Sequence, residues 1–278
     1  MRRFDVVRRI LEGSSGRVTE KNSITIKAHM SVRDQKKEKL DEISGFYVRP
    51  GNYRLNGARA MRGGVNFTIA SVGATSCDLL LFRRKQSAPY AIIRIPESYR
   101  VGSVYSIFVS GLDVEDFEYA YKLDGPYDPQ RGLYFDRNKL ILDPYARAVT
   151  GQRAWGVAKA QTDYHSRVVK ENFRWTRNDF PYTPMEDTII YEMHVRGFTR
   201  HKTSDVQYPG TFAGIIEKIP YLKELGVTAV ELMPIFEFDE TINSRSYNGK
   251  TLLEYWGYNT VAFFAPNTNN TVTRREEH

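Results

Sequence analysis

The first candidates for chemistry in this sequence are four carboxylates in or near two apolar runs. Two carboxyl groups about 5–5.5 Å apart can cleave a glycosidic bond with retention, one as the nucleophile and the other as acid and base. Nothing in their spacing gives any two of the four a reason to adopt that separation. They are Glu192, Glu231, Glu237 and Asp239.

The position of each carboxylate relative to its apolar run indicates its role. Glu192 and Glu231 lie inside the runs, where we expect an ion pair or a rim contact with Arg196 or a lysine. Glu237 and Asp239 come after the second run, at the strand end where the active sites of barrels form. These two side chains could therefore touch a substrate.

We expect structural roles for two further side chains whose types can take part in catalysis. His194 ends the first apolar run, and we expect it to bond to the backbone or to a carboxylate. Cys77 is the only cysteine and sits in an apolar run, which favours a buried thiol over a nucleophile. A single cysteine also excludes an intrachain disulfide and fits a reducing compartment.

Composition and charge exclude several classes of protein. Apolar residues make up 41% and charged residues 26%, as in a globular chain. The net charge of +7 is mostly interleaved with acids and comes with no zinc-finger or RNA-binding motif, which argues against a nucleic-acid partner. No run approaches the about 18 apolar residues of a membrane span, and no apolar signal segment is present. A cytoplasmic protein is therefore expected.

Short strand-like runs dominate residues 45–148 and predict an immunoglobulin-like β-sandwich. Turn residues separate the runs at regular intervals, as in antiparallel sandwiches. Residues 1–44 are polar and predict an N-terminal extension, and 149–187 predict a linker. The predicted strands are Val65–Ile69, Cys77–Phe82, Tyr90–Ile95, Val104–Val109 and Phe117–Leu123.

Residues 188–278 have the pattern of an α/β domain. Strands are predicted at 188–194, 227–232 and 258–264, with a helix from 212 to 222 between the first two. A strand–helix–strand unit implies parallel pairing. A (β/α)8 barrel needs about 250 residues, so this stretch supplies only the first three strands of an incomplete barrel. The fold class is multidomain, β followed by α/β.

The ends of that helix carry clear signals. Thr211 is a plausible N-cap and Gly226 a plausible residue after the C-terminus. Pro220 should kink or split the helix, because proline cannot donate to the carbonyl of Ile216.

Several motifs resemble the isoamylase and bacterial glycogen-debranching branch of the α-amylase family, glycoside hydrolase family 13. Three of the motifs are similar to the first three barrel strands of that family. The others are similar to the family-48 type carbohydrate-binding module that precedes the barrel. The absence of a transit-like leader favours the bacterial over the plastid members. The motifs are Tyr191–Thr199, Tyr221–Pro234, Tyr255–Thr260 with Phe263–Pro266, and, in the module, Leu123–Pro129, Phe135–Asp136 and Leu140–Ala146.

The resemblance implies hydrolysis of α-1,6 branch links in α-glucans such as glycogen, amylopectin or limit dextrin. It implies no cofactor and no metal. The family's nucleophile Asp, acid/base Glu and transition-state Asp follow later barrel strands and match no residue here, so no catalytic residue is assigned and this chain alone is expected to be inactive. Tyr258 matches the aromatic that stacks on glucose at the cleavage subsite, with Trp256 beside it. Either residue could instead belong to the core.

Three hypotheses stay open at this point. The chain can be a truncated, inactive fragment of a debranching enzyme, because the match runs to Pro266 and the polar tail that follows is not expected to continue the fold. It can be a non-catalytic glucan-binding or regulatory protein that uses the sandwich, where Tyr119 and Tyr121 share one face. Binding to nucleic acid rests on charge alone.

Overall fold

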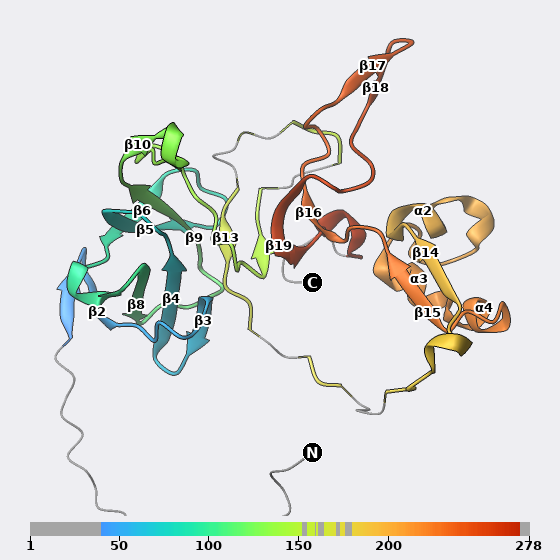
Figure 1. The fold of residues 1–278 in the computed structure, drawn as a ribbon, viewed down its shortest axis with the longest axis horizontal. Coiled ribbons are helices and arrows are strands. Elements are labelled where there is room, and N and C mark those ends of the chain that lie inside the picture. Colours follow the sequence, from blue (N-terminus) through green and yellow to red (C-terminus); the bar gives the residue numbers. More distant parts are fainter. Residues whose placement is uncertain are drawn as a thin grey trace, which may run out of the picture. The chain divides into compact units, whose positions relative to one another are not determined.

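The computed structural model describes residues 40–151, 155–158, 160, 164–170, 173–175 and 180–272 (Figure 1). The extension predicted at 1–44 lies outside these residues except for its last five. Among the helices so described, none is long and apolar enough to cross a membrane.

Strands form most of the regular structure. The helices are α2 (Val195–Arg200), α3 (Phe212–Glu217) and α4 (Ile219–Glu224), with short 3-10 turns η1 (Glu97–Tyr99), η2 (Pro129–Arg131), η4 (Met185–Asp187), η5 (Lys202–Ser204) and η6 (Thr268–Asn270). The strands are β1 (Asp41–Ile43), β2 (Phe46–Pro50), β3 (Gly57–Met61), β4 (Gly64–Ala70), β5 (Ser76–Arg83), β6 (Pro89–Arg94), β7 (Arg100–Val101), β8 (Val104–Ser110), β9 (Phe117–Asp124), β10 (Tyr127–Asp128), β11 (Leu133–Tyr134), β12 (Ala148–Val149), β13 (Ser166–Arg167), β14 (Ile190–Met193), β15 (Ala229–Leu232), β16 (Phe236–Phe238), β17 (Arg245–Tyr247), β18 (Lys250–Leu252) and β19 (Thr260–Pro266).

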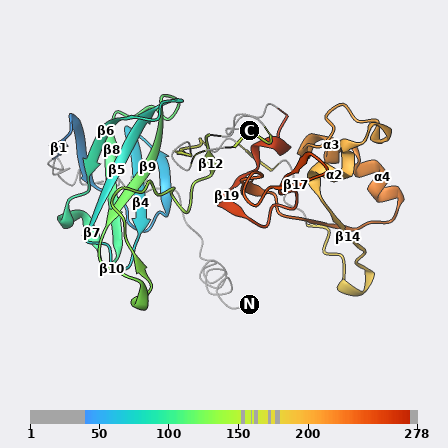
Figure 2. The same ribbon diagram turned by 90° about the horizontal axis from the view of Figure 1, so that it is seen from above.

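The predicted β-sandwich and all five of its predicted strands are confirmed. One antiparallel sheet has the order β1-β2-β8-β4-β3, with β7 on β8, and the other has the order β12-β13-β9-β5-β6. The two sheets lie face to face (Figure 2). Successive side chains of a strand alternate between faces, so Cys77, Leu79 and Leu81 of β5 all enter the shared core.

The sandwich extends beyond the predicted range 45–148 at both ends. β1 begins at Asp41, before that range, and pairs with β2. β13 lies in the stretch predicted as a linker, yet Ser166 pairs with Tyr119 of β9 and Arg167 pairs with Ala148 of β12. Strands of two or three residues are too short to show a period-2 pattern, which is why the sequence did not reveal them.

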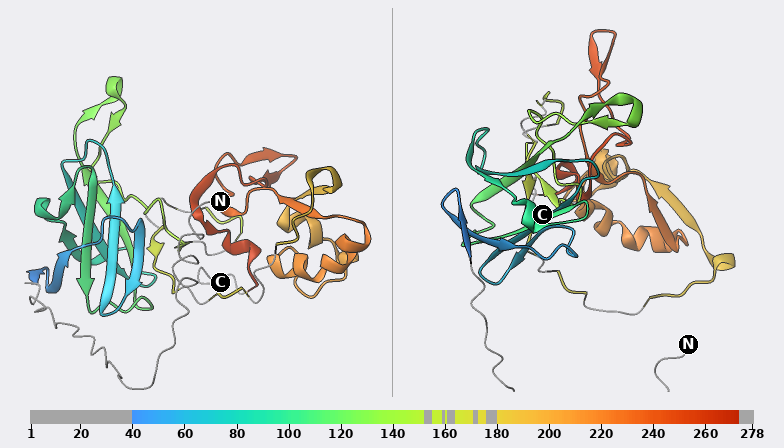
Figure 3. Two further views of the ribbon diagram at one scale, coloured as in Figure 1. Left: turned by 60° about the horizontal axis from the view of Figure 1, so that its bottom comes forward. Right: turned by 60° about the vertical axis from the view of Figure 1, so that its left-hand side comes forward.

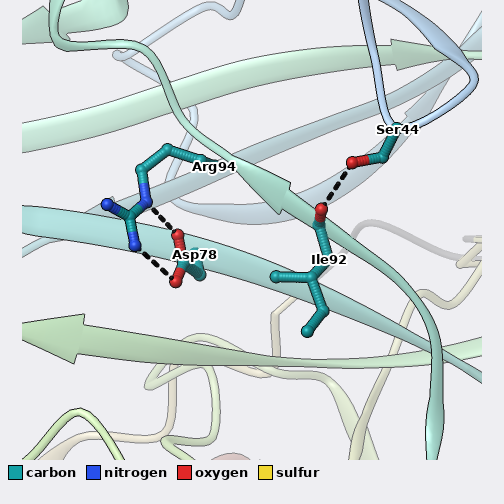
Figure 4. A network of polar contacts seen from close by, with 4 residues as sticks. All are labelled: Ser44, Asp78, Ile92 and Arg94. Atoms are coloured by element: carbon teal, nitrogen blue, oxygen red, sulfur yellow. Dashed lines mark hydrogen bonds and ion pairs between the residues drawn. The ribbon is translucent and has the colours of Figure 1, made fainter.

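Polar contacts tie β6, at the edge of its sheet, to neighbouring strands (Figure 4). Arg94 of β6 and Asp78 of β5 are register partners and form a two-point ion pair. The Arg94 Nε donates to Asp78 Oδ1, and Nη2 donates to Oδ2 at 3.0 Å. Ser44, in the turn between β1 and β2, donates its hydroxyl hydrogen to the Ile92 carbonyl at 2.7 Å. This bond satisfies a carbonyl on an exposed strand edge and connects the two sheets.

Residues 188–232 form the predicted strand–helix–strand unit. β14 and β15 pair in parallel from Ile190 with Ala229 to Met193 with Leu232. Thr211 accepts a hydrogen bond from the Gly214 amide at 3.2 Å and so caps α3, as predicted. The helix is split at Lys218, and Pro220 lies in the first turn of α4, where its missing N–H costs nothing.

The prediction of a third parallel barrel strand is wrong. β19 pairs antiparallel with β16, a strand that follows β15 directly, and the register shifts twice along the pair. Parallel neighbours require a crossover connection, usually a helix. Residues 239–259 instead contain the β17–β18 hairpin, which projects away from its neighbours (Figure 1 and the right panel of Figure 3).

The residues after Asn267 also differ from expectation. Thr268 to Thr271 are buried, although the polar sequence suggested a tail that does not continue the fold. The Thr268 amide donates to Glu237 Oε2 at 3.0 Å, and the Asn267 side chain caps η6 by accepting from the Asn269 amide at 2.9 Å. The buried Glu237 carboxylate thus accepts from the backbone of this stretch and from the side-chain nitrogen of Asn267, which helps to hold it against the fold.

Candidate functional site

The carboxyl ends of the two parallel strands meet at one edge of their sheet. Met193 and Leu232 are register partners, and the Met233 amide donates to the Met193 carbonyl at 2.9 Å. His194 therefore emerges beside Met233 and Pro234. In α/β folds this edge is where ligands bind.

His194 connects this edge to a segment 61 residues further along the chain. Its Nδ1 accepts a hydrogen bond from the Gly197 amide at 3.0 Å and caps α2. Its Nε2 lies 2.8 Å from the Tyr255 carbonyl oxygen, and the two rings stack with centroids 4.2 Å apart. His194 thus bonds to the backbone, as expected. Burial lowers its pKa, helped by the charge of Arg196 and opposed by the Tyr255 carbonyl.

Residues 255–258, which we call the aromatic segment, lie against the ends of these strands. Gly257 has φ +82°, and a Cβ there would lie 3.2 Å from the Phe238 ring and 3.3 Å from Pro234. A glycine therefore permits the close approach. Trp256 is 54% exposed and Tyr258 71% exposed, so neither is a core residue.

The two carboxylates that follow β15 are buried and bonded. Glu237 accepts from the Thr268 backbone N–H, and its other oxygen lies 3.4 Å from Nδ2 of the Asn267 side chain. Asp239 Oδ1 accepts from both the amide and the hydroxyl of Thr241, at 2.9 and 2.6 Å. These contacts stabilise the loops after β15, and both side chains are removed from solvent.

Glu192 and Glu231 are exposed register partners on the parallel strands. The guanidinium of Arg196, one of the partners expected for these carboxylates, lies over the Trp155 ring at 4.6 Å. Two like charges side by side on a strand pair are unfavourable unless solvent or a partner screens them.

The face of the sandwich that carries Tyr119 and Tyr121 cannot bind a sugar, whereas the β10–β11 hairpin presents two exposed tyrosines. Tyr119 and Tyr121 are fully buried, and the Tyr119 hydroxyl donates to Asp143 Oδ2 at 2.7 Å, so neither can stack on a sugar.

Cys77 is buried as predicted, and burial raises the pKa of its thiol.

The exposed face belongs to the β10–β11 hairpin, labelled β10 in Figure 1. Tyr127 and Tyr134 pair across its strands and are 71% and 63% exposed, with ring centroids 6.1 Å apart. Tyr127 lies in the Leu123–Pro129 motif, and Tyr134 lies outside the motifs that carry the family resemblance. Two tyrosines flanking a Pro-Gln-Arg turn were the available signal for this pair.

Within the described ranges, histidine, cysteine and acidic side chains form no group suited to holding a metal ion.

Comparisons with known proteins match both halves of the chain. The family described as carbohydrate-binding module 48 (isoamylase N-terminal domain) matches residues 55–146. The family described as alpha amylase, catalytic domain, matches residues 193–260. The second match begins at Met193, the last residue of β14, and covers β15 and the aromatic segment.

Individual relatives agree with these families. Isoamylase 1 of the chloroplast of Arabidopsis thaliana is 34% identical over 85% of this chain and 33% of its own length. Glycogen debranching enzyme of Serratia proteamaculans is 34% identical over 82% of this chain and 36% of its own length, so identity does not favour the bacterial relative over the plastid one. A solved structure of Bacillus subtilis type I pullulanase complexed with maltose has a TM-score of 0.59 and 23% identity, over 81% of this chain and 29% of that one, and supports the fold. Residues 55–146 are therefore similar to the isoamylase N-terminal domain and residues 193–260 to the catalytic domain of the α-amylase family, and the chain spans about a third of the length of its isoamylase and glycogen-debranching relatives.

Proposed function

We propose that this chain is part of a debranching glycoside hydrolase that acts on α-1,6 links of glycogen-like α-glucans. The observation that carries the proposal is the aromatic segment, fixed at the carboxyl ends of β14 and β15 with Trp256 and Tyr258 exposed. The relatives named as isoamylase and glycogen debranching enzyme support the substrate class.

In this proposal β14 and β15 are the first two strands of a (β/α)8 barrel. Their parallel pairing and the helices between them support that assignment. β16 and β19 then form an antiparallel extension at the carboxyl end of β15, and this extension carries the aromatic segment to the edge of the barrel.

Tyr258 and Trp256 supply the sugar contacts. The C–H face of a glucose ring packs against an aromatic face, and each such contact contributes about 1 kcal/mol beyond the buried area. Tyr258→Ala should weaken binding of maltotetraose to the 278-residue chain roughly fivefold by calorimetry. Tyr47→Ala, at an exposed tyrosine of β2 in the sandwich, is the matched control. Equal affinities of the Tyr258 variant and the unmodified chain would refute the assignment.

The 278-residue polypeptide should bind glucan without hydrolysing it. Glu237 and Asp239 already accept hydrogen bonds from the protein, and no other carboxylate has been assigned to cleavage. A reducing-end assay on glycogen tests this. Release of chains above the level of a heat-denatured control would contradict it.

A second candidate function is glucan binding by the sandwich. The exposed pair Tyr127 and Tyr134 favours it. The base of their hairpin is fixed because Gly125 and Gly73 leave room for the Phe135 ring, where a Cβ on Gly125 would lie 2.7 Å from it. Retention of the chain on immobilised glycogen should fall when both tyrosines become alanine. Unchanged retention would remove this candidate and leave the first intact.

A further inference from the structure

His194 can satisfy both of its hydrogen bonds in only one protonation state. The Gly197 backbone N–H always donates, so Nδ1, at 3.0 Å, must present a lone pair. The Tyr255 carbonyl always accepts, so Nε2, at 2.8 Å, must carry the hydrogen. The geometry therefore requires the neutral imidazole with its proton on Nε2.

The peptide unit that His194 contacts is held from both sides. The Tyr255 carbonyl and the Trp256 amide belong to one planar peptide. His194 donates to its oxygen, and the Glu254 carboxylate accepts from its N–H at 3.1 Å. These two bonds fix the orientation of the backbone immediately before Trp256.

Ring packing adds a third constraint on the same residue. The Tyr255 ring lies parallel to the imidazole within 14°, and its hydroxyl lies 2.6 Å from where a Cβ on Gly197 would be. Tyr255 thus rests on the first turn of α2, a position that only glycine at 197 permits. Since Gly257 is packed against Phe238 and Pro234, the aromatic segment is held at Tyr255 and at Gly257, while Trp256 and Tyr258 face solvent.

We propose that His194 is a positioning residue that holds the aromatic segment in its glucan-binding conformation when neutral and releases it when protonated. This inference rests on the proposed function of Trp256 and Tyr258. An imidazolium would turn a hydrogen on Nδ1 toward the Gly197 N–H, setting two donors against each other. Glucan binding should therefore weaken in mildly acidic solution.

The charged groups around the ring support the neutral form at neutral pH. On α2, Arg196 opposes a second positive charge, and burial acts in the same direction. On the aromatic segment, the Tyr255 carbonyl favours the imidazolium, while the Glu254 carboxylate is engaged by the Trp256 amide. Burial and Arg196 outweigh the carbonyl, so the pKa of His194 lies below its ordinary value.

Two substitutions separate the two bonds. His194→Asn keeps an acceptor for the cap of α2, because asparagine is a good N-cap, but it loses the bond and the stacking to Tyr255. His194→Gln can keep a donor near the Tyr255 carbonyl and cannot be protonated. His201→Asn is the matched control, since His201 also caps a turn by accepting from the Thr203 amide but has no bond to the aromatic segment.

The test measures maltotetraose affinity of the full chain by calorimetry at about pH 7.5 and about pH 5.5. We expect the unmodified chain to lose a few-fold in affinity at the lower pH, because the lowered pKa of His194 leaves part of the imidazole neutral there. His194→Asn should lose roughly five- to tenfold already at the higher pH, because it lacks the bond to Tyr255 at every pH. His194→Gln should bind with little pH dependence, and His201→Asn should behave as the unmodified chain does. Full affinity of His194→Asn, or an undiminished pH effect in His194→Gln, would overturn the proposal.

A readout without sugar distinguishes this inference from the proposed function. Nitrogen-15 spectra of the imidazole should show the hydrogen on Nε2 at about pH 7.5, and the Trp256 indole resonance should shift as His194 is protonated. A protonated Nδ1 at neutral pH would refute the inference even if Tyr258→Ala weakens binding. If the spectra agree but Tyr258→Ala has no effect, the proposed function fails and the positioning contact remains.

Discussion

The β-sandwich and residues 188–272 differ sharply in how they bury apolar side chains. In the sandwich, Phe67, Leu79 and Ile107 come from three different strands and are fully buried in one shared core. In the second region, Ile190 and Val230 on the parallel strands stay exposed. The difference follows from architecture, since two facing sheets enclose a core between them, whereas a parallel strand pair needs layers on both faces.

The contrast separates stability from binding. The best-buried aromatics of the sandwich, such as Tyr119 and Tyr121, are unavailable to any ligand. The residues proposed to contact glucan lie in the region with fewer buried apolar contacts, where segments open most easily. The hydrogen bond and ring stacking of His194 with Tyr255 therefore contribute more to local order there than a similar contact would within the sandwich.

The largest expected effect comes from the sandwich core. Phe67→Ala removes a fully buried ring that packs edge-on against Tyr119, and it should lower the free energy of unfolding by about 4 kcal/mol. Ile190→Ala, at a 55% exposed side chain, should cost less than about 0.5 kcal/mol. Urea denaturation measures both. Comparable costs would break the contrast between the regions.

A buried polar pair should be the next most costly to disrupt. Glu118 lies 2.8 Å from His165 Nδ1 and accepts from the Lys85 amide at 3.1 Å, while the His165 ring stacks on Phe82. Glu118→Ala leaves these donors without an acceptor and should cost about 3 kcal/mol in unfolding free energy. A cost below that of Ile190→Ala would show that the pair contributes nothing.

The same pair predicts a dependence of stability on pH. Burial alone would raise the pKa of Glu118, but the hydrogen bonds from His165 and Lys85 outweigh it and leave the pKa below 4.5. A lowered carboxyl pKa stabilises the fold above about pH 4.5, and this stability is lost as the pH falls through the lower folded value. Glu118→Gln should flatten acid unfolding below pH 4.5 relative to the unmodified chain. An unchanged acid limb would rule out Glu118 as its source.

A smaller effect is expected at the cap of α3. Thr211 Oγ1 accepts from the Gly214 amide and donates to the Tyr208 carbonyl at 2.8 Å. Thr211→Ala should lower the stability of the second region by about 1 kcal/mol, and Thr211→Ser, which keeps the hydroxyl, should recover most of it. Hydrogen exchange of the α3 amides measures the loss locally. Equal exchange in all three proteins would contradict the capping role.

The parts of the fold that the sequence predicted are those set by local signals. The run Cys77–Phe82 is long enough to identify β5, and Thr211 with Pro220 locates the start and the break of the α3–α4 pair. The antiparallel pairing of β19 with β16 was not predictable, because it depends on the path of the connecting residues 239–259. An antiparallel return and a helical crossover give similar apolar runs.

The candidate site shows the same division. Tyr258 and Trp256 were identified from motif and residue type, and their exposure agrees with a surface role. The link from His194 to Tyr255 spans 61 residues and is made to a backbone carbonyl, which no side-chain pattern reveals. The burial of Glu237 and Asp239 likewise depends on Thr241 and Thr268, whose sequence positions alone do not indicate hydrogen bonding.

The smallest effect is expected on the surface of the sandwich, and it sharpens the argument about where stability resides. The ion pair of Arg94 and Asp78 has good two-point geometry, but the Arg94 side chain is largely exposed. An exposed pair contributes about 0.5 kcal/mol, so Arg94→Met should barely change the urea midpoint, and Asp78→Asn should add little to it. A double-mutant cycle in low and high salt gives the coupling energy directly. A coupling energy close to the stability cost of Phe67→Ala would mean that edge charges, and not the enclosed core, hold β5 and β6 together.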